Sequence, residues 1–304
     1  MSERTAAALA VRLGGRLEGP DQPYSAVAPL QSAGAQDVAY ATGALPEPCG
    51  AGVLLVSQGI EGRCCIVLSD PKLGFIHLIH ELFPVEHPAG VHPQATVDPT
   101  AEVDETATVH PGVVVGAGCR VGAGTVLHPG VVLYPDTVVG AGCVLHAGCV
   151  LGADGFSFHP TPAGPVKVPQ IGRVVVGDDV ELGANCCVDR AFLGDTVVGP
   201  GCKLDNLVHV GHNATLGRHV IIAAQGALSG SVTVGDGAIL GGQVGVVEHI
   251  HIGAGASVGA QSGVGRDVPA GEAVLGTPAE PAARMRRIYA ALKHLPEMFR
   301  GWQG

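Results

Sequence analysis

Most of the chain follows a six-residue pattern of aliphatic residues separated by small and polar ones. An aliphatic side chain stands at every sixth position from Val91 to Leu151 without a gap. The period resumes at Val176, takes in four extra residues after Val188, and then continues to Val264. This period suits neither an amphipathic helix nor a long strand, but it suits short strands joined by turns in a parallel β-helix. The pattern therefore predicts a mainly β protein.

Small residues hold a fixed place in the repeat. The fourth residue after each aliphatic is Ala, Val, Thr or Cys between Ala95 and Cys149, and Gly often follows the aliphatic directly. Three hexads close one coil, and successive coils stack at the inter-strand spacing of roughly 4.8 Å. We therefore expect residues that are three hexads apart in the sequence to lie one above the other.

Two stretches leave the period. Residues 154–170 contain Phe156, Phe158 and four prolines, so we expect a loop that projects from one corner and serves binding. After Val264 the repeat ends, and residues 281–299 have the composition of a helix with a break at Pro296.

The N-terminal part of the chain, residues 1–90, lacks the repeat and has the pattern of a small α/β domain. His87-Pro88-Ala89-Gly90 is turn chemistry and marks the junction with the repeat. The predicted elements are a helix at 5–13, buried strands at 53–56 and 65–68, and a helix at 71–83. The chain is thus expected to comprise an N-terminal domain at 1–90, a β-helix at 91–275 and a C-terminal helical extension at 276–304.

Composition and charge exclude several classes of protein. The 17 Lys+Arg and 27 Asp+Glu residues give a net charge of −10, so the molecule as a whole attracts neither nucleic acid nor an anionic membrane. No stretch long enough to span a bilayer is free of polar residues or Gly, and no uninterrupted apolar h-region follows Glu3 and Arg4, so neither a transmembrane segment nor a signal peptide is expected. Of the nine cysteines, five occupy the small-residue position of the repeat. We expect a reduced, cytoplasmic protein.

The residues best suited to carry out chemistry lie between Asp205 and Asn213. His212 is the second residue after an inward aliphatic, Gly230 follows it by three hexads, and three further hexads lead to Glu248 with His249 beside it. One edge of the β-helix should therefore present a histidine below an exposed backbone N–H. A neutral histidine can accept the proton of an attacking amine, and a glycine N–H can stabilise an oxyanion. This arrangement predicts acyl transfer without a serine or cysteine nucleophile.

Spacing alone leaves the role of His212 open. The chain has 14 histidines, and several, such as His110 and His128, lie on the repeat surface with no visible task. The nearby Asp205, Asn206 and His209 favour a functional site. Asp205 either orients His212 or satisfies a turn, and the sequence does not distinguish the two.

Six segments carry a resemblance to a known family; they are residues 152–158, 166–173, 177–184, 188–190, 193–196 and 203–213. They closely resemble the UDP-3-O-acylglucosamine N-acyltransferases of lipid A biosynthesis. The resemblance implies a left-handed parallel β-helix and the transfer of a (3-hydroxy)acyl chain from acyl carrier protein to the 2-amino group of a UDP-3-O-acyl-glucosamine. It implies His212 as the general base, Gly230 as the oxyanion donor and His249 near the acyl donor, with no cofactor beyond the carrier's phosphopantetheine and no metal.

The same resemblance implies a homotrimer that binds a UDP-sugar. Substrate contacts are expected at Asp205, Asn206, His209, Phe156 and Phe158, and Tyr40 is expected to face the nucleotide. The family's uracil-binding stretch has several aromatics, whereas residues 40–46 here keep only Tyr40.

The C-terminal end differs in charge from the rest of the chain. Residues 281–304 hold five basic side chains against Glu297 alone, a net charge of +4. Acyl carrier proteins are acidic, so this segment, with Arg284, Arg286 and Arg287, is expected to dock the carrier. The alternative is a solvated helix whose charges only maintain solubility.

Three other functions remain as alternatives. The first is a hexapeptide-repeat N-acetyltransferase that uses acetyl-CoA on another nucleotide sugar. The second is a β-helical zinc carbonic anhydrase built on His209, His212 and His249, although His209 is expected at a different corner from His212. The third is a purely structural trimerising prism, which leaves the Asp205–Asn213 cluster unexplained.

Overall fold

The computed structural model describes residues 4–295, and the chain divides into two compact units, Met1–Glu86 and His87–Gly304. Among the described residues, no helix combines the length and the apolar character needed to cross a bilayer. All nine cysteines are free thiols.

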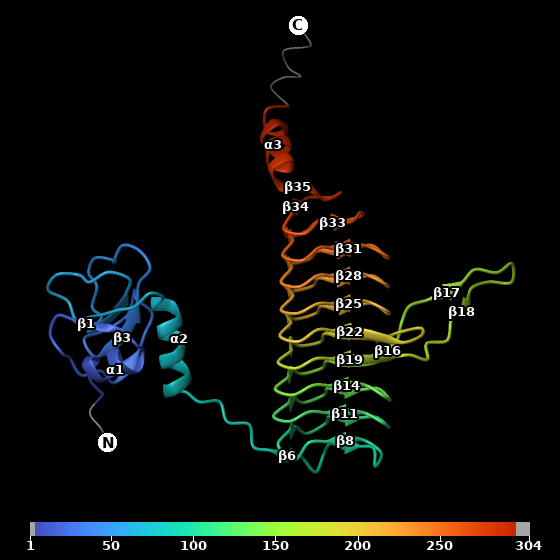
Figure 1. The fold of residues 1–304 in the computed structure, drawn as a ribbon, viewed down its shortest axis with the longest axis horizontal. Helices are drawn as coiled ribbons and strands as arrows, with labels where there is room; N and C mark the ends of the chain where they lie inside the picture. Colours follow the sequence, from blue (N-terminus) through green and yellow to red (C-terminus); the bar gives the residue numbers. More distant parts are fainter. Residues whose placement is uncertain (1–3, 296–304) are drawn as a thin grey trace, which may run out of the picture. The chain divides into compact units, whose positions relative to one another are not determined.

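The first unit is a five-stranded sheet with two helices (Figure 1). Helix α1 (Ala6–Arg12) begins where the Thr5 hydroxyl accepts the Ala8 N–H, and α2 (Pro71–Leu82) begins where the Asp70 carboxylate accepts the Leu73 N–H. The strands, in sheet order, are β1 (Arg16–Glu18), β5 (Cys65–Val67), β4 (Val53–Val56), β3 (Asp37–Tyr40) and β2 (Ala26–Val27). Only β1 is antiparallel to its neighbour.

The predicted elements of this unit agree with the structure within one or two residues, but the sequence missed β1, β2 and β3. These strands are two to four residues long and show no clear alternation of buried and exposed positions. Hydrophobic periodicity cannot reveal such short strands, because a strand is recognised only over several alternations.

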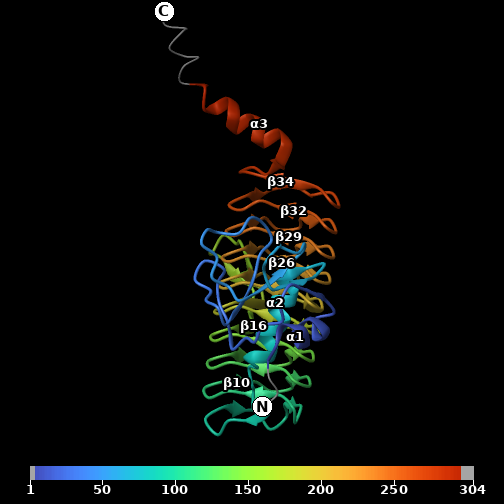
Figure 2. The same ribbon diagram turned by 90° about the vertical axis from the view of Figure 1, so that its left-hand side faces the viewer.

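The second unit is a three-sided β-solenoid whose coils stack along one axis (Figures 1 and 2). The nine-stranded sheet holds β7 (Thr96–Val97), β10 (Val114–Val115), β13 (Val132–Leu133), β16 (Val150–Asp154), β21 (Cys187–Arg190), β24 (His209–Val210), β27 (Ala227–Leu228), β30 (Gly245–Val246) and β33 (Gly263–Val264). The eight-stranded sheet holds β8 (Glu102–Val103), β11 (Arg120–Val121), β14 (Val138–Val139), β19 (Arg173–Val176), β22 (Asp195–Val198), β25 (Thr215–Leu216), β28 (Thr233–Val234) and β31 (His251–Ile252). The eleven-stranded sheet holds β6 (Gly90–Val91), β9 (Thr108–Val109), β12 (Val126–Leu127), β15 (Val144–Leu145), β20 (Glu181–Leu182), β23 (Lys203–Leu204), β26 (Ile221–Ile222), β29 (Ile239–Leu240), β32 (Ser257–Val258), β34 (Ala273–Leu275) and β35 (Glu280–Pro281).

The hexad aliphatics point inward and form the solenoid core, so the predicted β-helix is confirmed. In regular coils the paired residues are three hexads apart in the sequence, as Val115 and Leu133 are. The separation in sequence is larger where residues are inserted: Leu151 pairs with Val188, and Val188 pairs with Val210. Insertions thus change the sequence spacing between stacked residues without disturbing the stack.

The corners of the solenoid need a left-handed backbone conformation. The third residue after the inward aliphatic has a positive φ, as in Asn213 (61°) and His249 (62°). Glycine and asparagine adopt this conformation most easily, which explains the glycines found at this corner position, such as Gly118 and Gly124. The corner also turns the side chain at the preceding position out of the coil.

The insertion at residues 154–170 projects from the solenoid as expected, and it contains a β-hairpin that the sequence did not predict. Its strands β17 (Phe158–His159) and β18 (Val166–Lys167) pair antiparallel and project from the side of the solenoid (Figure 1). Phe156 is 88% exposed and packs edge-on against Phe158. The hairpin therefore carries an aromatic pair with little cover from its own chain.

Helix α3 (Ala282–Leu292) follows the last coil (Figure 2). It is anchored by Met285, which is buried against Gly276 and leaves no space for a side chain there. The predicted break at Pro296 and the helical residues up to Phe299 lie outside the described residues.

A column of stacked histidines occupies one corner of the first coils. The rings of His110 and His128 lie 5.1 Å apart and nearly parallel, as do those of His128 and His146, and His87 packs edge-on against the first two. Glu181 lies 3.0 Å from His146 Nε2. Among the described residues, the buried Nε2 of His110 has no hydrogen-bond partner. The histidines without a visible task in the sequence are therefore a packed structural element.

This column should make the solenoid sensitive to acid. Burial lowers the pKa of His128, and the charges of His146, His110 and His87 lower it further. The unfolded chain therefore binds a proton at a higher pH than the folded chain does. The contribution of neutral His128 to the free energy of unfolding is fully present above the ordinary histidine pKa of about 6.5 and is lost as the pH falls below it. We expect the melting temperature to fall between about pH 7 and 5, and His128→Asn to reduce that fall, while His251→Asn at an exposed position does not. Equal falls in both variants and the wild type would contradict this expectation.

Candidate active site

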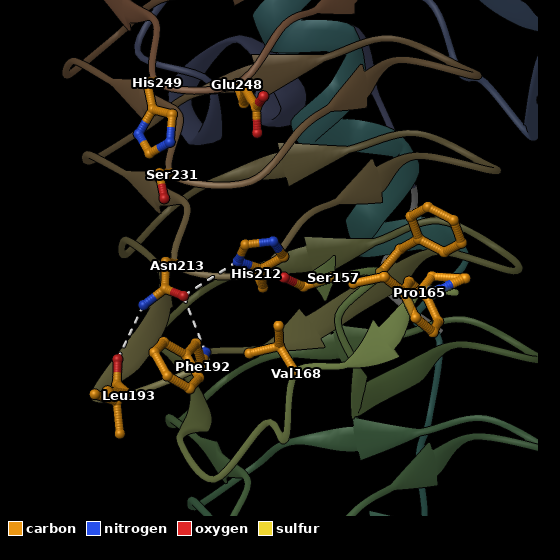
Figure 3. A pocket seen from close by; sticks show the side chains of 12 residues that line it. Ser157, Pro165, Val168, Phe192, Leu193, His212, Asn213, Ser231, Glu248 and His249 are labelled. Atoms are coloured by element: carbon orange, nitrogen blue, oxygen red, sulfur yellow. Dashed lines mark hydrogen bonds between the residues drawn. The ribbon is translucent and has the colours of Figure 1, made fainter. Parts of the chain in front are cut away.

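The expected column of residues is present at the corner after the nine-stranded sheet. Strands β24, β27 and β30 pair in register, which places His212, Gly230 and Glu248 on successive coils. Asn213, Ser231 and His249 form the next column (Figure 3). His249 and Glu248 are exposed, whereas His212 is half-buried.

Asn213 fixes the orientation and the tautomer of His212. The Asn213 side-chain amide donates to the Leu193 carbonyl at 2.9 Å, and its Oδ1 accepts the Phe192 N–H at 2.9 Å (Figure 3). Because one backbone partner accepts and the other donates, they determine which end of the Asn213 amide is nitrogen and which is oxygen. Oδ1 also lies 3.2 Å from His212 Nδ1, so Nδ1 must carry the proton. The lone pair on Nε2 is therefore free to accept a proton.

The His212 ring lies between two glycines that are far apart in the sequence. A Cβ built at Gly230 would lie 2.7 Å from His212 Nε2, and a Cβ built at Gly155 would lie 2.8 Å from His212 Cδ2. Gly155 belongs to the base of the projecting hairpin. Only glycine leaves space for the His212 side chain at either position, so both positions restrict where the ring can lie.

The Gly230 N–H is available for a ligand. Within residues 4–295 it has no backbone acceptor, whereas the carbonyl of Gly230 accepts the His249 N–H at 3.2 Å. His212 and Gly230 line the same cavity, and the imidazole lies close to this backbone segment. A proton acceptor beside a free backbone donor is what acyl transfer to an amine requires.

Two cavities meet at His212. The larger, of about 990 Å³, is lined mainly by apolar side chains of the hairpin and of residues 192–193, together with His212, Asn213, Ser231 and His249 (Figure 3). The smaller, of about 450 Å³, combines polar side chains, among them Asp189, His209 and Ser229, with the apolar Leu228 and Val247. Phe156 and Glu248 line both. The site therefore offers a mainly apolar compartment and a mixed one, and one imidazole lines both.

The sequence analysis overlooked Asp189. The residue is buried, its carboxylate lies in the smaller cavity, and Oδ2 is 3.7 Å from His209 Nε2. Burial raises the pKa of this carboxyl, and the neighbouring His209 and His212 act in the opposite direction. The signal was present in the sequence: with four inserted residues, Asp189 stands one coil below Gly211, next to His212. The expectation that His209 lies at a different corner from His212 is wrong, since both line this cavity.

Asp205 and Asn206 do not lie with His212 in the single chain. They line a third cavity, of about 560 Å³, on the eleven-stranded sheet, with His146, Glu181 and Lys203. The Asp205 carboxylate accepts the Asn206 N–H at 2.7 Å, and the Asn206 side chain accepts the Ala184 N–H at 2.7 Å. Of the two alternatives that the sequence left open, Asp205 therefore satisfies a turn within one chain and does not orient His212 there. The segment between Asp205 and His212 leads from one sheet to the next.

The remaining candidate residues belong to strand β3 of the first unit and to helix α3. Tyr40 ends strand β3 of the first unit, half-buried, with its ring 5.1 Å from that of Phe75. Arg284 is paired with Glu280 at 3.2 Å, and Arg286 and Arg287 are exposed on α3.

Groups of three or more His, Cys, Asp or Glu side chains arranged to hold a metal ion are absent from residues 4–295. His209, His212 and His249 in particular do not form such a group. The zinc alternative therefore has no ligand set in the described part of the chain.

Comparisons with known proteins support the hexapeptide assignment. The bacterial transferase hexapeptide family (six repeats) matches residues 118–153 and 195–226. The structure of a UDP-N-acetylglucosamine O-acyltransferase from Moraxella catarrhalis RH4 is similar with a TM-score of 0.59 and 25% identity, over 69% of this chain and 83% of that one. A UDP-N-acetylglucosamine acyltransferase of Francisella novicida, at 24% identity and the same TM-score, shares the fold over 64% of this chain and 70% of its own.

The relatives that match in sequence point to a narrower group of acyltransferases. A UDP-3-O-acylglucosamine N-acyltransferase of Nitratidesulfovibrio vulgaris is 57% identical over 149 residues, which are 49% of this chain and 43% of that protein. The protein of that name from Leptospira biflexa is 58% identical over 83 residues, 27% of this chain and 24% of its own length. The matches thus span less than half the length of these relatives. The resemblance seen in the sequence is confirmed: this chain carries bacterial transferase hexapeptide repeats and is similar, over up to about half of its length, to the UDP-3-O-acylglucosamine N-acyltransferases.

Proposed function

We propose that the protein is an N-acyltransferase that moves a (3-hydroxy)acyl chain from acyl carrier protein to the 2-amino group of a UDP-3-O-acyl-glucosamine in lipid A biosynthesis. The observation that carries the proposal is the His212 imidazole, which lies against Gly230 where two cavities meet. Its Nε2 is free to accept a proton, and among the described residues the Gly230 N–H has no acceptor. The names of the relatives support the same acceptor.

The reaction follows from this geometry. The amine attacks the thioester carbonyl while His212 Nε2 accepts its proton, and the Gly230 N–H stabilises the resulting oxyanion. Collapse of the intermediate breaks the C–S bond, and the imidazolium returns the proton to the leaving thiolate. The larger cavity suits an apolar acyl chain, because the aromatic rings of Phe156, Phe158 and Phe192 line it. His249 and Glu248 lie one coil above Gly230, where they can contact the donor.

We propose a homotrimer with the site between subunits. In a single chain the Phe156–Phe158 pair is exposed, and Asp205 and Asn206 lie on a different face from His212. A neighbouring copy whose eleven-stranded sheet faces the His212 corner would cover the aromatic pair and bring Asp205 and Asn206 toward the substrate. Sedimentation equilibrium measures the mass; an active monomer contradicts the proposal.

The donor is tested by a panel of acyl thioesters with the UDP-sugar amine as acceptor. We expect product by mass spectrometry from long-chain acyl carrier protein thioesters and little from acetyl-CoA. Preference for acetyl-CoA would instead establish the N-acetyltransferase alternative.

Carrier docking is proposed for α3. Among the described residues neither Arg286 nor Arg287 pairs with a carboxylate, whereas Arg284 is held by Glu280. We expect the double change Arg286→Ala and Arg287→Ala to raise KM for the carrier thioester about tenfold at low salt and to weaken its salt dependence, with the KM of the sugar unchanged. Arg120→Ala, an exposed arginine on the eight-stranded sheet, is the matched control. Equal KM values in the double variant and this control would assign α3 to assembly alone.

A further inference from the structure

Asp189 is a buried carboxylate that the proposed reaction does not yet use. It extends from β21 one residue after the inward Val188, and its side chain is 11% exposed. Within the described residues, no donor lies within hydrogen-bonding distance of its oxygens, and the nearest cationic partner is His209 Nε2 at 3.7 Å. A buried carboxylate without hydrogen bonds is costly, so its position demands an explanation.

The other charged groups around this cavity are few. Asp154 lies on the neighbouring strand β16 but is paired with Lys167 of the hairpin, and Glu248 is exposed at the cavity rim. Asp189 is therefore the buried negative charge closest to the imidazoles of His209 and His212, with which it shares the smaller cavity. Its charge acts on both rings across that cavity.

We propose that Asp189, together with His209, is the positioning pair for His212: its carboxylate stabilises the imidazolium that forms when His212 Nε2 accepts the proton of the attacking amine. This inference rests on the proposed function. Asn213 fixes the tautomer of His212 from the Nδ1 side, and Asp189 supplies the charge from the cavity side.

The physical basis is a mutual Coulomb interaction. His209 and His212 lower the pKa that burial raises at Asp189, which means that their cations and its carboxylate stabilise each other. The interaction is stronger in a partly dehydrated cavity than at the surface. The Asp189 carboxylate interacts with both rings, so a positive charge on His209 reduces the stabilisation that Asp189 gives to the His212 cation.

The test is Asp189→Asn, which preserves shape and removes charge. We expect kcat to fall about tenfold or more, the KM of the sugar to change less than about twofold, and the acid limb of kcat/KM to move to lower pH. The matched control is Asp195→Asn, which removes an exposed carboxylate on β22 and should leave all three unchanged. An unchanged acid limb in the Asp189 variant overturns the proposal, and so does a rise in the KM of the sugar with constant kcat, which would make Asp189 a substrate contact.

A second measurement does not depend on the reaction. In the full-length protein without substrates, the NMR titration midpoint of the His212 ring should move to lower pH in Asp189→Asn, and Asp189→Glu should restore part of the shift. If Asp189→Asn does not fold, His209→Gln tests the pair from the other side: the acid limb should move to higher pH, since the whole carboxylate charge then acts on His212. No change there overturns the proposal. Failure of the wild type to transfer acyl groups would refute the proposed function, whereas a constant titration midpoint would refute the role of Asp189.

Discussion

Replacing His212 by Ala is expected to lower kcat by roughly a hundredfold or more while the fold and the assembly remain intact. The side chain is half-buried and lies against two glycines, outside the aliphatic core of the solenoid. The change therefore removes a base rather than a core residue. Turnover of the carrier thioester with the UDP-sugar amine, at saturating concentrations of both, measures the effect.

Two variants make this result specific. His249→Ala removes an exposed imidazole one coil above Gly230 and should reduce turnover less than His212→Ala does. His251→Ala removes an exposed histidine from the eight-stranded sheet and should leave turnover unchanged. Near-normal turnover of the His212 variant would exclude the mechanism.

Gly230→Ala is expected to produce the second large effect, a loss of about a hundredfold in kcat. The new methyl group would lie 2.6 Å from His212 Cε1 and 2.7 Å from Nε2, so the ring must leave the position in which its lone pair faces the Gly230 N–H. Displacement of the base should therefore lower kcat strongly, and any disturbance of the Gly230 N–H adds to this, because loss of one oxyanion donor alone costs roughly a hundredfold or more.

Gly245→Ala is the matched control for this change. Gly245 lies on β30 of the same sheet, and a Cβ there meets no atom within 4 Å. Both variants should keep the melting temperature within a few degrees of the wild type. If the two alanine variants had equal turnover, the contact between Gly230 and His212 would have no catalytic meaning.

The spacing of aliphatic residues determined the architecture of the second unit. Each inward residue of the solenoid, from Val109 to Val264, could be read from the sequence, because every coil buries only against its neighbours and the period is therefore local. The same period placed Gly230 above His212, and it also contained the information that Asp189 lies below Gly211. The short strands of the first unit had no such period and were missed.

Only the tertiary structure decided which neighbours in the sequence act together. Asp205 and His212 are close in the sequence, yet the corner between them directs their side chains to different faces. Asp189 and Gly155 stand much further from His212 along the chain, yet one shares its cavity and the other contacts its ring. The Asn213 amide that fixes the His212 tautomer likewise depends on its contacts with Phe192 and Leu193 of the neighbouring coil. A repeat determines the coil on which a residue lies, whereas insertions and corners determine the direction of each side chain, and these depend on packing between distant segments.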